Sequence, residues 1–254
     1  MTHSVICENL WKSYHVHRPV GLKALVVGSA SARETRFARQ WALSGVNFRV
    51  SRGQAFGVLG HNGSGKTTLL SILLGTVPAD RGRLDLQGRV ASLLELGAGF
   101  HGDLTGEENI FLYGSILGMT LKEIRTRLSA IVEFSELEDA VENPLRTYSA
   151  GMIARLGFSV IAHCAADILL IDEVLAVGDA RFQEKCHQYL REFKHRNGTL
   201  IIVSHNMKEL AAVCDEGICL ELGQVVDAGP VETVIEGYGT RTTPTGAGKT
   251  AARP

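Results

Sequence analysis

The segment GHNGSGKT, residues 60–67, restricts the possible fold of this chain more than any other part of its sequence. It matches the pattern G-x-x-x-x-G-K-[ST] and lies between an apolar run typical of a strand, AFGVL, and a run with helical spacing, TLLSILLG. In such a unit the backbone N–H groups of the loop can surround a phosphate chain, and the helix start contributes its positive dipole end. The segment therefore predicts an α/β fold with a phosphate site at the edge of a mainly parallel sheet.

We expect two side chains of this phosphate loop (P-loop) to act on a nucleotide directly. Lys66 would reach the β and γ phosphates of ATP, and the hydroxyl of Thr67 would bind Mg²⁺. The alternative is a chance match in a glycine-rich loop. A comparable segment near the C-terminus, TGAGKT, lacks the first glycine and a preceding strand, so we interpret it as disordered tail. The loop residues expected to contact the nucleotide are Gly60, Asn62, Gly63, Ser64, Gly65, Lys66, Thr67 and Thr68.

Two further polar groups follow short apolar runs that are typical of buried parallel strands. ILLIDE ends in Asp172 and Glu173, and LIIVS is followed by His205. Beside a phosphate loop, Asp172 could hold Mg²⁺ through water, and Glu173 could polarise an attacking water. His205 would lie at the same edge of the sheet, where it could contact the γ phosphate or hold Glu173 in position. Without the phosphate loop, a solvated turn and a structural histidine would be the better interpretations.

The composition argues against several other classes of protein. The chain has 26 basic and 27 acidic residues, so no net basic field favours nucleic acid, and we expect no nucleic-acid partner. The five cysteines are scattered without C-x-x-C spacing, which argues against a disulfide framework or a structural zinc site and favours a reducing cytosol. No signal peptide is recognisable, and no run reaches the roughly 18 to 20 apolar residues of a membrane span. A role at a membrane would therefore depend on a partner.

The rest of the sequence predicts the organisation of one main domain, residues 1–237, followed by a flexible tail, residues 238–254. An arginine-containing insertion at about residues 17–41 separates two strand-like segments near the N-terminus. From about residue 97 to residue 164 the pattern is mainly helical and indicates a helical subdomain inserted into the sheet-forming core. Two helix starts are recognisable there, at Thr105 with Glu107 and Glu108, and at Thr120 with the capping-box partner Glu123.

The segment NPLRTYSAGMIARLGFSV, residues 143–160, places Ser149, Ala150 and Gly151 at a helix start that would need only one cap. Together with the motifs above, it gives the chain a resemblance to the ATPase subunits of ABC transporters. YSAGM is similar to the L-S-G-G-Q signature of that family, which binds the γ phosphate held by the other subunit, as a helix start with small residues and a hydroxyl can do. The resemblance implies a P-loop NTPase core with an antiparallel β subdomain and an inserted helical subdomain. It also implies a head-to-tail homodimer in which the signature of one copy closes over ATP bound by Lys66 of the other.

The same resemblance assigns two more residues and leaves two positions without a match. Asp179, in AVGDA, corresponds to the D-loop and would cross the dimer axis. Tyr14, in LWKSY, corresponds to the aromatic that stacks on adenine, although an ordinary strand tyrosine is the alternative. Met152 replaces the signature glutamine. The glutamine loop contains no glutamine, and its equivalent position is residue 95 or 96, so the Mg²⁺ and coupling contact usual in that loop has no matching residue.

Three phrases, ELGAGFHGDLTGEENI, TYSAGMIARLGF and DEVLAVGDARFQEKC, are similar to the ABC subfamily that exports lipid-linked polysaccharides such as capsule, O-antigen and teichoic acid. This resemblance extends from about residue 5 to residue 237. It implies a lipid-linked polysaccharide substrate, two copies of a polytopic membrane permease, and a peripheral location at the cytoplasmic face of the inner (cytoplasmic) membrane. Residues 97–134 would dock onto the permease. Some members carry a further C-terminal carbohydrate-binding domain, which we do not expect in this chain.

Several alternatives to this interpretation stay open at the level of sequence. The arginines of the insertion could meet lipid headgroups or a pyrophosphate-linked glycan, or the insertion could be a solvated connection. The cargo could be a drug or a small lipid, because only the three phrases indicate polysaccharide. A soluble ABC protein of translation or DNA repair is the third possibility, but such proteins usually carry tandem ATPase units, long coiled coils or zinc modules, and this sequence shows none of these signals.

Overall fold

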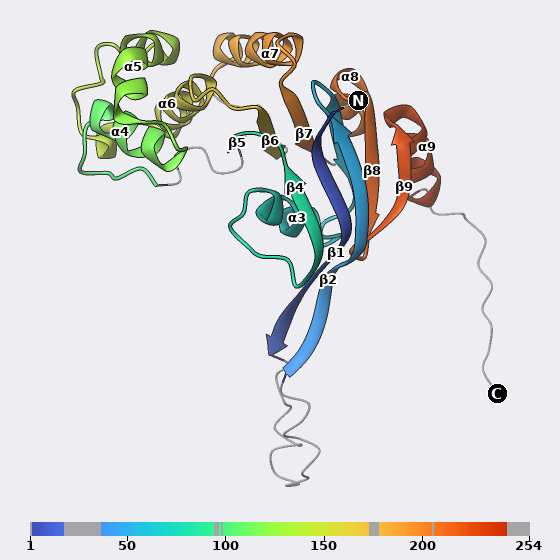
Figure 1. Cartoon of the computed structure of the whole chain (residues 1–254). Coiled ribbons are helices and arrows are strands. Elements are labelled where there is room, and N and C mark those ends of the chain that lie inside the picture. Colours follow the sequence, from blue (N-terminus) through green and yellow to red (C-terminus); the bar gives the residue numbers. More distant parts are fainter. Residues whose placement is uncertain are drawn as a thin grey trace, which may run out of the picture.

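The computed structural model of the protein describes residues 2–17, 37–93, 97, 99–172, 178–204 and 206–242. A six-stranded sheet with the order β5-β6-β7-β3-β8-β9 forms its centre (Figure 1). All described strand pairs of this sheet are parallel except the pair of β8 with β9, which is antiparallel. The prediction of a mainly parallel sheet is therefore confirmed. The strands are β3 (Ala55–Leu59), β5 (Val90–Ser92), β6 (Ile168–Asp172), β7 (Thr199–Val203), β8 (Glu216–Glu221) and β9 (Gln224–Pro230).

Side chains of the central strands alternate between two hydrophobic cores. In β3, Ala55 and Leu59 enter one core, whereas Phe56 and Val58 enter the other, and β6 and β7 divide in the same way. Successive side chains of a strand point to opposite faces, so both faces of this sheet must be covered. Side chains of α6 to α9 cover the first face, and α3 (Lys66–Leu73) with a second sheet covers the other. This explains why these strands read as continuous apolar runs in the sequence.

The second sheet is antiparallel and has the order β2-β1-β4. Its strands are β1 (His3–His17), β2 (Phe37–Ser51) and β4 (Arg81–Leu86). β1 and β2 pair from His3 opposite Ser51 to His17 opposite Phe37. The predicted insertion at about residues 17–41 is therefore wrong at its second boundary, because residues 37–41 belong to β2, whereas β1 ends at residue 17. Residues 18–36 lie outside the described part of the chain.

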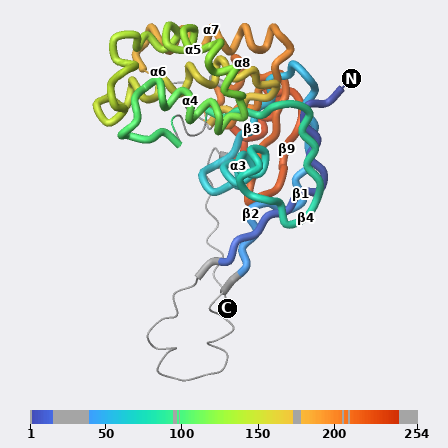
Figure 2. Tube along the Cα trace, turned by 60° about the vertical axis from the view of Figure 1, so that its left-hand side comes forward, coloured from blue at the N-terminus to red at the C-terminus, as the bar shows by residue number. Residues whose placement is uncertain are grey.

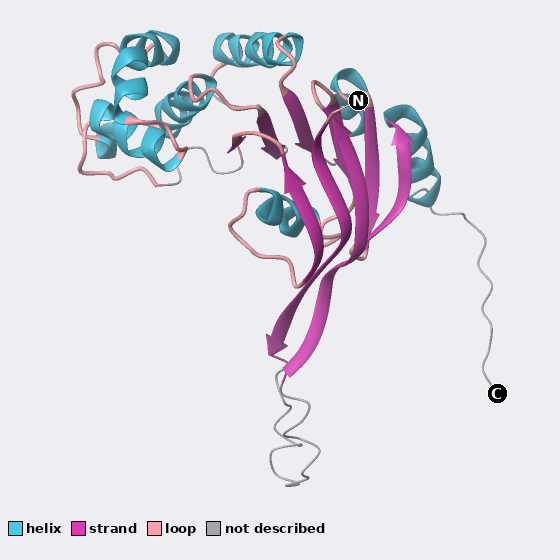
Figure 3. Cartoon of the chain, in the orientation of Figure 1, coloured by secondary structure: helices cyan, strands magenta, loops and turns pink. Residues whose placement is uncertain are grey.

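The helices between β5 and β6 form a separate body at one end of the molecule, opposite the far end of the β1–β2 hairpin (Figures 2 and 3). They are α4 (Gly106–Ile116), α5 (Leu121–Ser135), the short 3-10 helix η1 (Leu145–Thr147) and α6 (Ala150–Ala162). Both α4 and α5 begin with a capping box, formed by Thr105 with Glu108 and by Thr120 with Glu123. All of them lie within residues 97–164, the range for which the sequence predicts a helical subdomain.

The C-terminal part of the described chain adds three helices to the core: α7 (Ala180–His195), α8 (Met207–Val213) and α9 (Val231–Thr242). The predicted start of a flexible tail at residue 238 is wrong, because that position lies inside α9. Burial of Val234 and Tyr238 in the first core extends the helix beyond the predicted boundary. Residues 243–254 lie outside the described part. Among the helices that the structure describes, none has the length and apolar character needed to cross a membrane.

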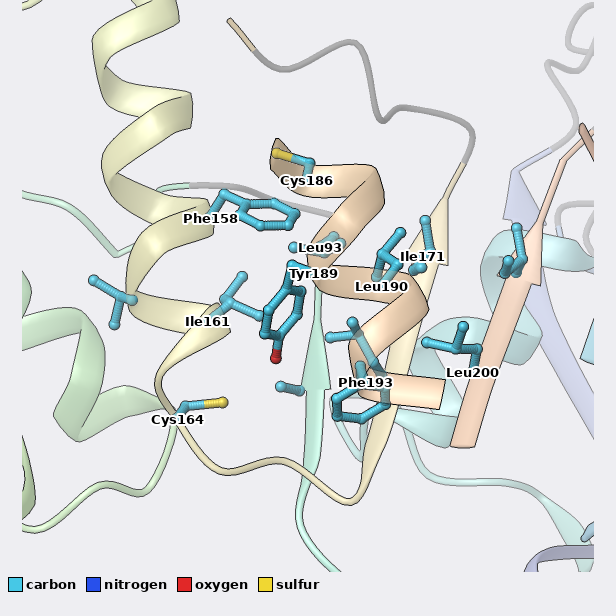
Figure 4. Close-up of a cluster of buried hydrophobic side chains, with 14 of the residues drawn as sticks. Leu93, Phe158, Ile161, Cys164, Ile171, Cys186, Tyr189, Leu190, Phe193 and Leu200 are labelled. Carbon is cyan, nitrogen blue, oxygen red and sulfur yellow. The ribbon is translucent and has the colours of Figure 1, made fainter. Parts of the chain in front are cut away.

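Aromatic side chains join the helical subdomain to the core. Phe158 of α6 is fully buried, and its ring centroid lies 6.1 Å from that of Phe134, 6.1 Å from that of Phe182 and 5.7 Å from that of Tyr189. Figure 4 shows Phe158 facing α7, which carries Cys186 and Tyr189. Phe134 belongs to α5, so this one ring contacts the helices on both sides of α6.

Replacing Phe158 by alanine should lower the free energy of unfolding by about 3 to 5 kcal/mol, because it removes a buried ring and leaves a cavity between three helices. Urea unfolding followed by circular dichroism measures this loss. Leu121→Ala, at a side chain that is 56% exposed on the same subdomain, is the control and should change the free energy by no more than about 0.5 kcal/mol. Equal effects of the two changes would contradict the central role of Phe158.

Candidate functional site

The phosphate loop connects β3 to α3. Gly63 (φ 80°) and Gly65 (φ 109°) have left-handed backbone conformations that residues with a Cβ rarely adopt. A Cβ on Gly65 would also lie 2.6 Å from the carbonyl oxygen of Ala42 in β2. Glycine is therefore required at residue 65 by the backbone angle and by the close approach of another strand.

The loop folds around its own lysine. The ammonium group of Lys66 donates hydrogen bonds to the carbonyl oxygens of Gly60 (2.6 Å) and His61 (2.9 Å). Ser64 is buried, and its Oγ has no hydrogen-bond partner among the described residues. A buried hydroxyl without a partner is costly, so a phosphate oxygen that accepts a hydrogen bond from it would stabilise the loop. The residues present therefore fit a phosphate chain.

A cleft of about 550 Å³ opens beside the loop. Asp172 at the end of β6 pairs with Val203 of β7, which in turn pairs with Val58 of β3. Because the carboxyl ends of these parallel strands meet at one edge, Asp172 lies beside the loop that follows β3. The cleft is lined by Tyr14, Gln40, Trp41, Ala42, Asn62, Gly63, Gly65, Lys66, Thr67, Thr68, Asp172 and Leu222.

Thr67 and Asp172, the two predicted Mg²⁺ ligands, both line this cleft. The described residues contain no group of three or more His, Cys, Asp or Glu side chains that could hold a metal by themselves. Mg²⁺ in nucleotide sites usually takes one or two protein ligands together with the phosphates, so the pair fits a metal site that a nucleotide completes. Glu173, His205 and the two candidates for the glutamine-loop position, residues 95 and 96, lie outside the described part.

Four residues of the cleft were not predicted from the sequence: Gln40, Trp41, Ala42 and Leu222. The first three belong to β2. Gln40 and Trp41 fall where the sequence predicts an insertion, and the strand register places Gln40 opposite Tyr14. Tyr14 itself is 42% exposed. The length of the first strand was the available signal, since an antiparallel partner for the whole of SVICENLWKSY has to begin before residue 41. Leu222 lies in the turn between β8 and β9, and no local pattern predicts its contact.

Asp80, in the loop before β4, forms hydrogen bonds to both strands of the β1–β2 hairpin, which forms one wall of the cleft. Its carboxylate accepts hydrogen bonds from the backbone N–H (3.0 Å) and hydroxyl (2.6 Å) of Ser13, from Lys12 (3.1 Å) and from Arg39 (3.2 Å). Arg39 in turn lies over the ring of Trp41, 4.5 Å from its centroid. The hydrogen bonds from Ser13 and Lys12 hold the pKa of Asp80 well below its ordinary value. The strands that carry Tyr14, Gln40 and Trp41 are thereby tied to one carboxylate.

A second hollow lies at the start of α6 and shares no residue with the cleft. Ser149 is the N-cap of α6, and its hydroxyl accepts a hydrogen bond from the N–H of Met152 (3.2 Å). The predicted signature residues and the predicted D-loop aspartate are together here. The hollow is lined by Ser149, Ala150, Gly151, Met152, Ala154, Arg155, Gly178 and Asp179.

Arg155, which was not predicted from the sequence, joins the two halves of this second hollow. Its guanidinium group donates to the carbonyl of Ser135 (2.9 Å) and the carboxylate of Glu136 (2.9 Å), and it lies 4.0 Å from the carboxylate of Asp179. Asp179 caps α7 by accepting a hydrogen bond from the N–H of Phe182 (2.9 Å). That bond, with a smaller contribution from Arg155, lowers the pKa of Asp179. Asp179 therefore faces the hollow as a carboxylate.

Comparison with known proteins identifies one family. The family model described as "ABC transporter" matches residues 43–176. Two relatives from Klebsiella pneumoniae, both named O-antigen export system ATP-binding protein RfbB, are 45% and 43% identical to this chain, and the alignments cover 89% and 91% of this chain and 92% and 95% of the relatives. The teichoic acids export ATP-binding protein TagH from Lactiplantibacillus plantarum is 39% identical, over 79% of this chain and 55% of that protein.

Solved structures share the fold of this chain. The structure titled "Structure of ATP binding subunit of ABC transporter" has a TM-score of 0.72 and 20% identity, with 94% of both chains covered. A dimeric, post-hydrolysis ATP-binding cassette bound to ADP and phosphate has a TM-score of 0.67 and 20% identity, with 89% of this chain and 98% of that chain covered. The fold class predicted from the sequence is therefore confirmed.

Asp80→Asn should weaken the folded state at neutral pH and have less effect in acid. Because the pKa of Asp80 is lower in the folded chain, its stabilisation is complete above the ordinary carboxyl pKa of about 4 and is lost as the pH falls below that value towards the folded pKa. Urea midpoints of both proteins at several pH values measure this, and the difference between them should shrink below about pH 4. Asp103→Asn, at an exposed carboxylate paired only with Arg146 among the described residues, is the control and should change the midpoint little. A pH-independent difference for Asp80→Asn would contradict the assignment.

Proposed function

The chain belongs to the ABC transporter family and is one of its ATP-hydrolysing subunits, and from this premise we propose that it drives export of a lipid-linked polysaccharide through a transmembrane permease. The proposed cargo rests on the similarity to two O-antigen export ATP-binding proteins. Both are at least 43% identical to this chain, over at least 92% of their own length. The similarity to a teichoic acid export protein supports the same chemical class, a polymer carried on a lipid.

The cleft beside the phosphate loop is the proposed ATP site. Backbone N–H groups of the loop would surround the phosphates, while the ammonium group of Lys66 and the hydroxyl of Ser64 would bind their oxygens. Tyr14, exposed on the wall of the cleft, would stack on the adenine. Thr67 and Asp172 would hold Mg²⁺, which when bound neutralises charge on the β and γ phosphates.

For the reaction itself, we propose that Glu173 orients or deprotonates the attacking water and that His205 contacts the γ phosphate or holds Glu173. Asp172 ends β6 beside the phosphate loop, which supports a place for the next residue near the reacting phosphate. Lys66 would stabilise the negative charge that develops on the transferred phosphoryl group.

The second hollow supports a homodimer. Ser149, Ala150 and Gly151 surround a helix start that can bind an anion, yet they share no hollow with Lys66 of their own chain. We propose that this hollow closes over ATP bound by the other copy, with Asp179 at the dimer axis. Nucleotide shared across the interface would then stabilise the closed dimer by its differential affinity for that state, and hydrolysis would allow it to reopen.

We further propose that two copies of the permease bind the helical subdomains at the cytoplasmic face of the membrane. Ile116 and Leu121, at the two ends of the turn between α4 and α5, are 57% and 56% exposed. Apolar side chains that face solvent at one turn of a separate helical body support a contact with another protein there. Residues 97–134, which include both, form the proposed contact segment.

Glu173→Gln should retain ATP binding and lower turnover by about 100-fold or more, because the amide cannot accept the proton of the attacking water. Lys66→Ala should instead weaken ATP binding itself. Equilibrium ATP binding and phosphate release by the purified chain separate these two effects. Glu184→Gln, the same substitution at an exposed ion-paired position of α7, is the control and should leave both unchanged. Turnover by Glu173→Gln near the wild-type rate would remove Glu173 from the catalytic role.

In cells, replacing the chromosomal copy with Glu173→Gln should abolish surface polysaccharide and cause lipid-linked polymer to accumulate on the inner face of the membrane. Surface labelling, compared with extracts of the inner face, measures both pools, and the accumulated material identifies the cargo. Cells with Glu184→Gln should keep the wild-type distribution. Unchanged surface polysaccharide in the Glu173→Gln strain would refute the proposed cargo while leaving the ATPase assignment intact.

A further inference from the structure

Tyr238 of helix α9 contacts the phosphate loop. The hydroxyl of Tyr238 and Nδ1 of His61 lie 3.1 Å apart in a hydrogen bond, and the centroids of their rings are 5.0 Å apart. His61 is the second residue of the phosphate loop, whereas Tyr238 follows it by 177 residues in the chain. The contact therefore joins the predicted ATP site to an element outside residues 43–176, the range that the family model matches.

His61 is well placed to transmit this contact to the lysine of the loop. Its carbonyl oxygen accepts hydrogen bonds from the ammonium of Lys66 (2.9 Å) and from the N–H of Ser64 (3.1 Å). The backbone of His61 thus contacts the side chain of Lys66 and the backbone of Ser64, while its ring is held by Tyr238. A shift of the His61 ring would move the carbonyl that helps to position Lys66.

Tyr238 is held more firmly than the residue it contacts. It is 8% exposed and packs in the first hydrophobic core with Val231 and Val234 of the same helix, whereas His61 is exposed. The next turn of α9 is tied to β9 by an ion pair between Arg241 and Asp227. The helix also lies so close to β9 that a Cβ on residue 237 would be 2.4 Å from the carboxylate of Asp227. The sheet and the core therefore fix Tyr238, and Tyr238 limits the positions available to His61.

We infer that Tyr238 is a positioning residue for the phosphate loop, and that α9 raises the affinity for ATP by holding His61, and through it Lys66, in the geometry that binds phosphate. The inference rests on the proposed function, because it requires the cleft to be the ATP site. A loop held in its binding geometry spends less time in other conformations, so its apparent affinity is higher. Once ATP is bound, its phosphates would themselves hold Lys66 in place, so the catalytic role of Lys66 would not depend on the contact with Tyr238. Loss of the contact should therefore change ATP binding and leave the rate at saturation unchanged.

Tyr238→Phe tests this directly, because it keeps the buried ring and removes only the hydroxyl. A hydrogen bond of ordinary strength predicts a dissociation constant and a KM for ATP that are about 3- to 10-fold higher, with kcat within about twofold of the wild type. His61→Phe should have the same effect, and the double variant should bind ATP no more weakly than either single variant, because both remove one interaction. Fluorescent ATP-analogue binding and steady-state hydrolysis by the full chain measure these values.

Tyr189→Phe is the matched control, since it removes the hydroxyl of another buried tyrosine. Tyr189 belongs to α7 and lines neither the cleft nor the second hollow. It should leave the dissociation constant and KM unchanged. Three results would overturn the inference: a lower melting temperature of Tyr238→Phe with unchanged ATP affinity, additive effects of the two variants, or a fall in kcat without a change in KM. Any of these results with a wild-type chain that binds ATP would contradict the inference alone. A wild-type chain that failed to bind ATP would contradict the proposed function as well.

Discussion

The parallel pairing of β3, β6 and β7 is the constraint on which the rest of the molecule depends. These three strands are buried on both faces, so their side chains supply two hydrophobic cores at once, and their polar neighbours can appear only where the strands end. Because parallel strands end at a common edge, the phosphate loop after β3 and Asp172 at the end of β6 meet there. Burial of apolar side chains in the two cores thus fixes where the polar groups of the site lie. The buried side chains themselves need not contact a ligand.

The cleft is completed by parts of the chain that are distant from this edge in sequence. The β1–β2 hairpin brings Tyr14 and Trp41, and the turn between β8 and β9 brings Leu222. That turn is tied to both neighbours, because the N–H of Gly223 donates to the carbonyl of Ser64 (2.9 Å) and its carbonyl accepts from the N–H of Ser44 (2.8 Å). The phosphate loop is therefore held by short backbone contacts on one side and by the core strand β3 on the other.

Local patterns predicted the phosphate loop, the apolar strands, both helix starts and the capping box at Thr120, because each depends on residues that are neighbours in the chain. The residues that were missed depend on pairing between distant segments. Gln40 and Trp41 required the register of two long strands, and Arg155 required the packing of α6 against α7. The boundaries near residues 41 and 237 were wrong for the same reason, since pairing with β1 extended β2, and burial of Val234 and Tyr238 extended α9, beyond their local signals. Glu173 and His205 stay predictions.

The division of β3 between two cores has a consequence for how the length of this chain can vary. Because the side chains alternate along the strand, one inserted residue would exchange the two sets and place Phe56 where Ala55 now packs. The same insertion would advance the phosphate loop by about 3.3 Å past Asp172. A one-residue insertion or deletion within β3 would therefore disturb both cores and the site at once. We expect homologous chains to differ in length in loops whose lengthening does not move the ends of the strands that carry the site.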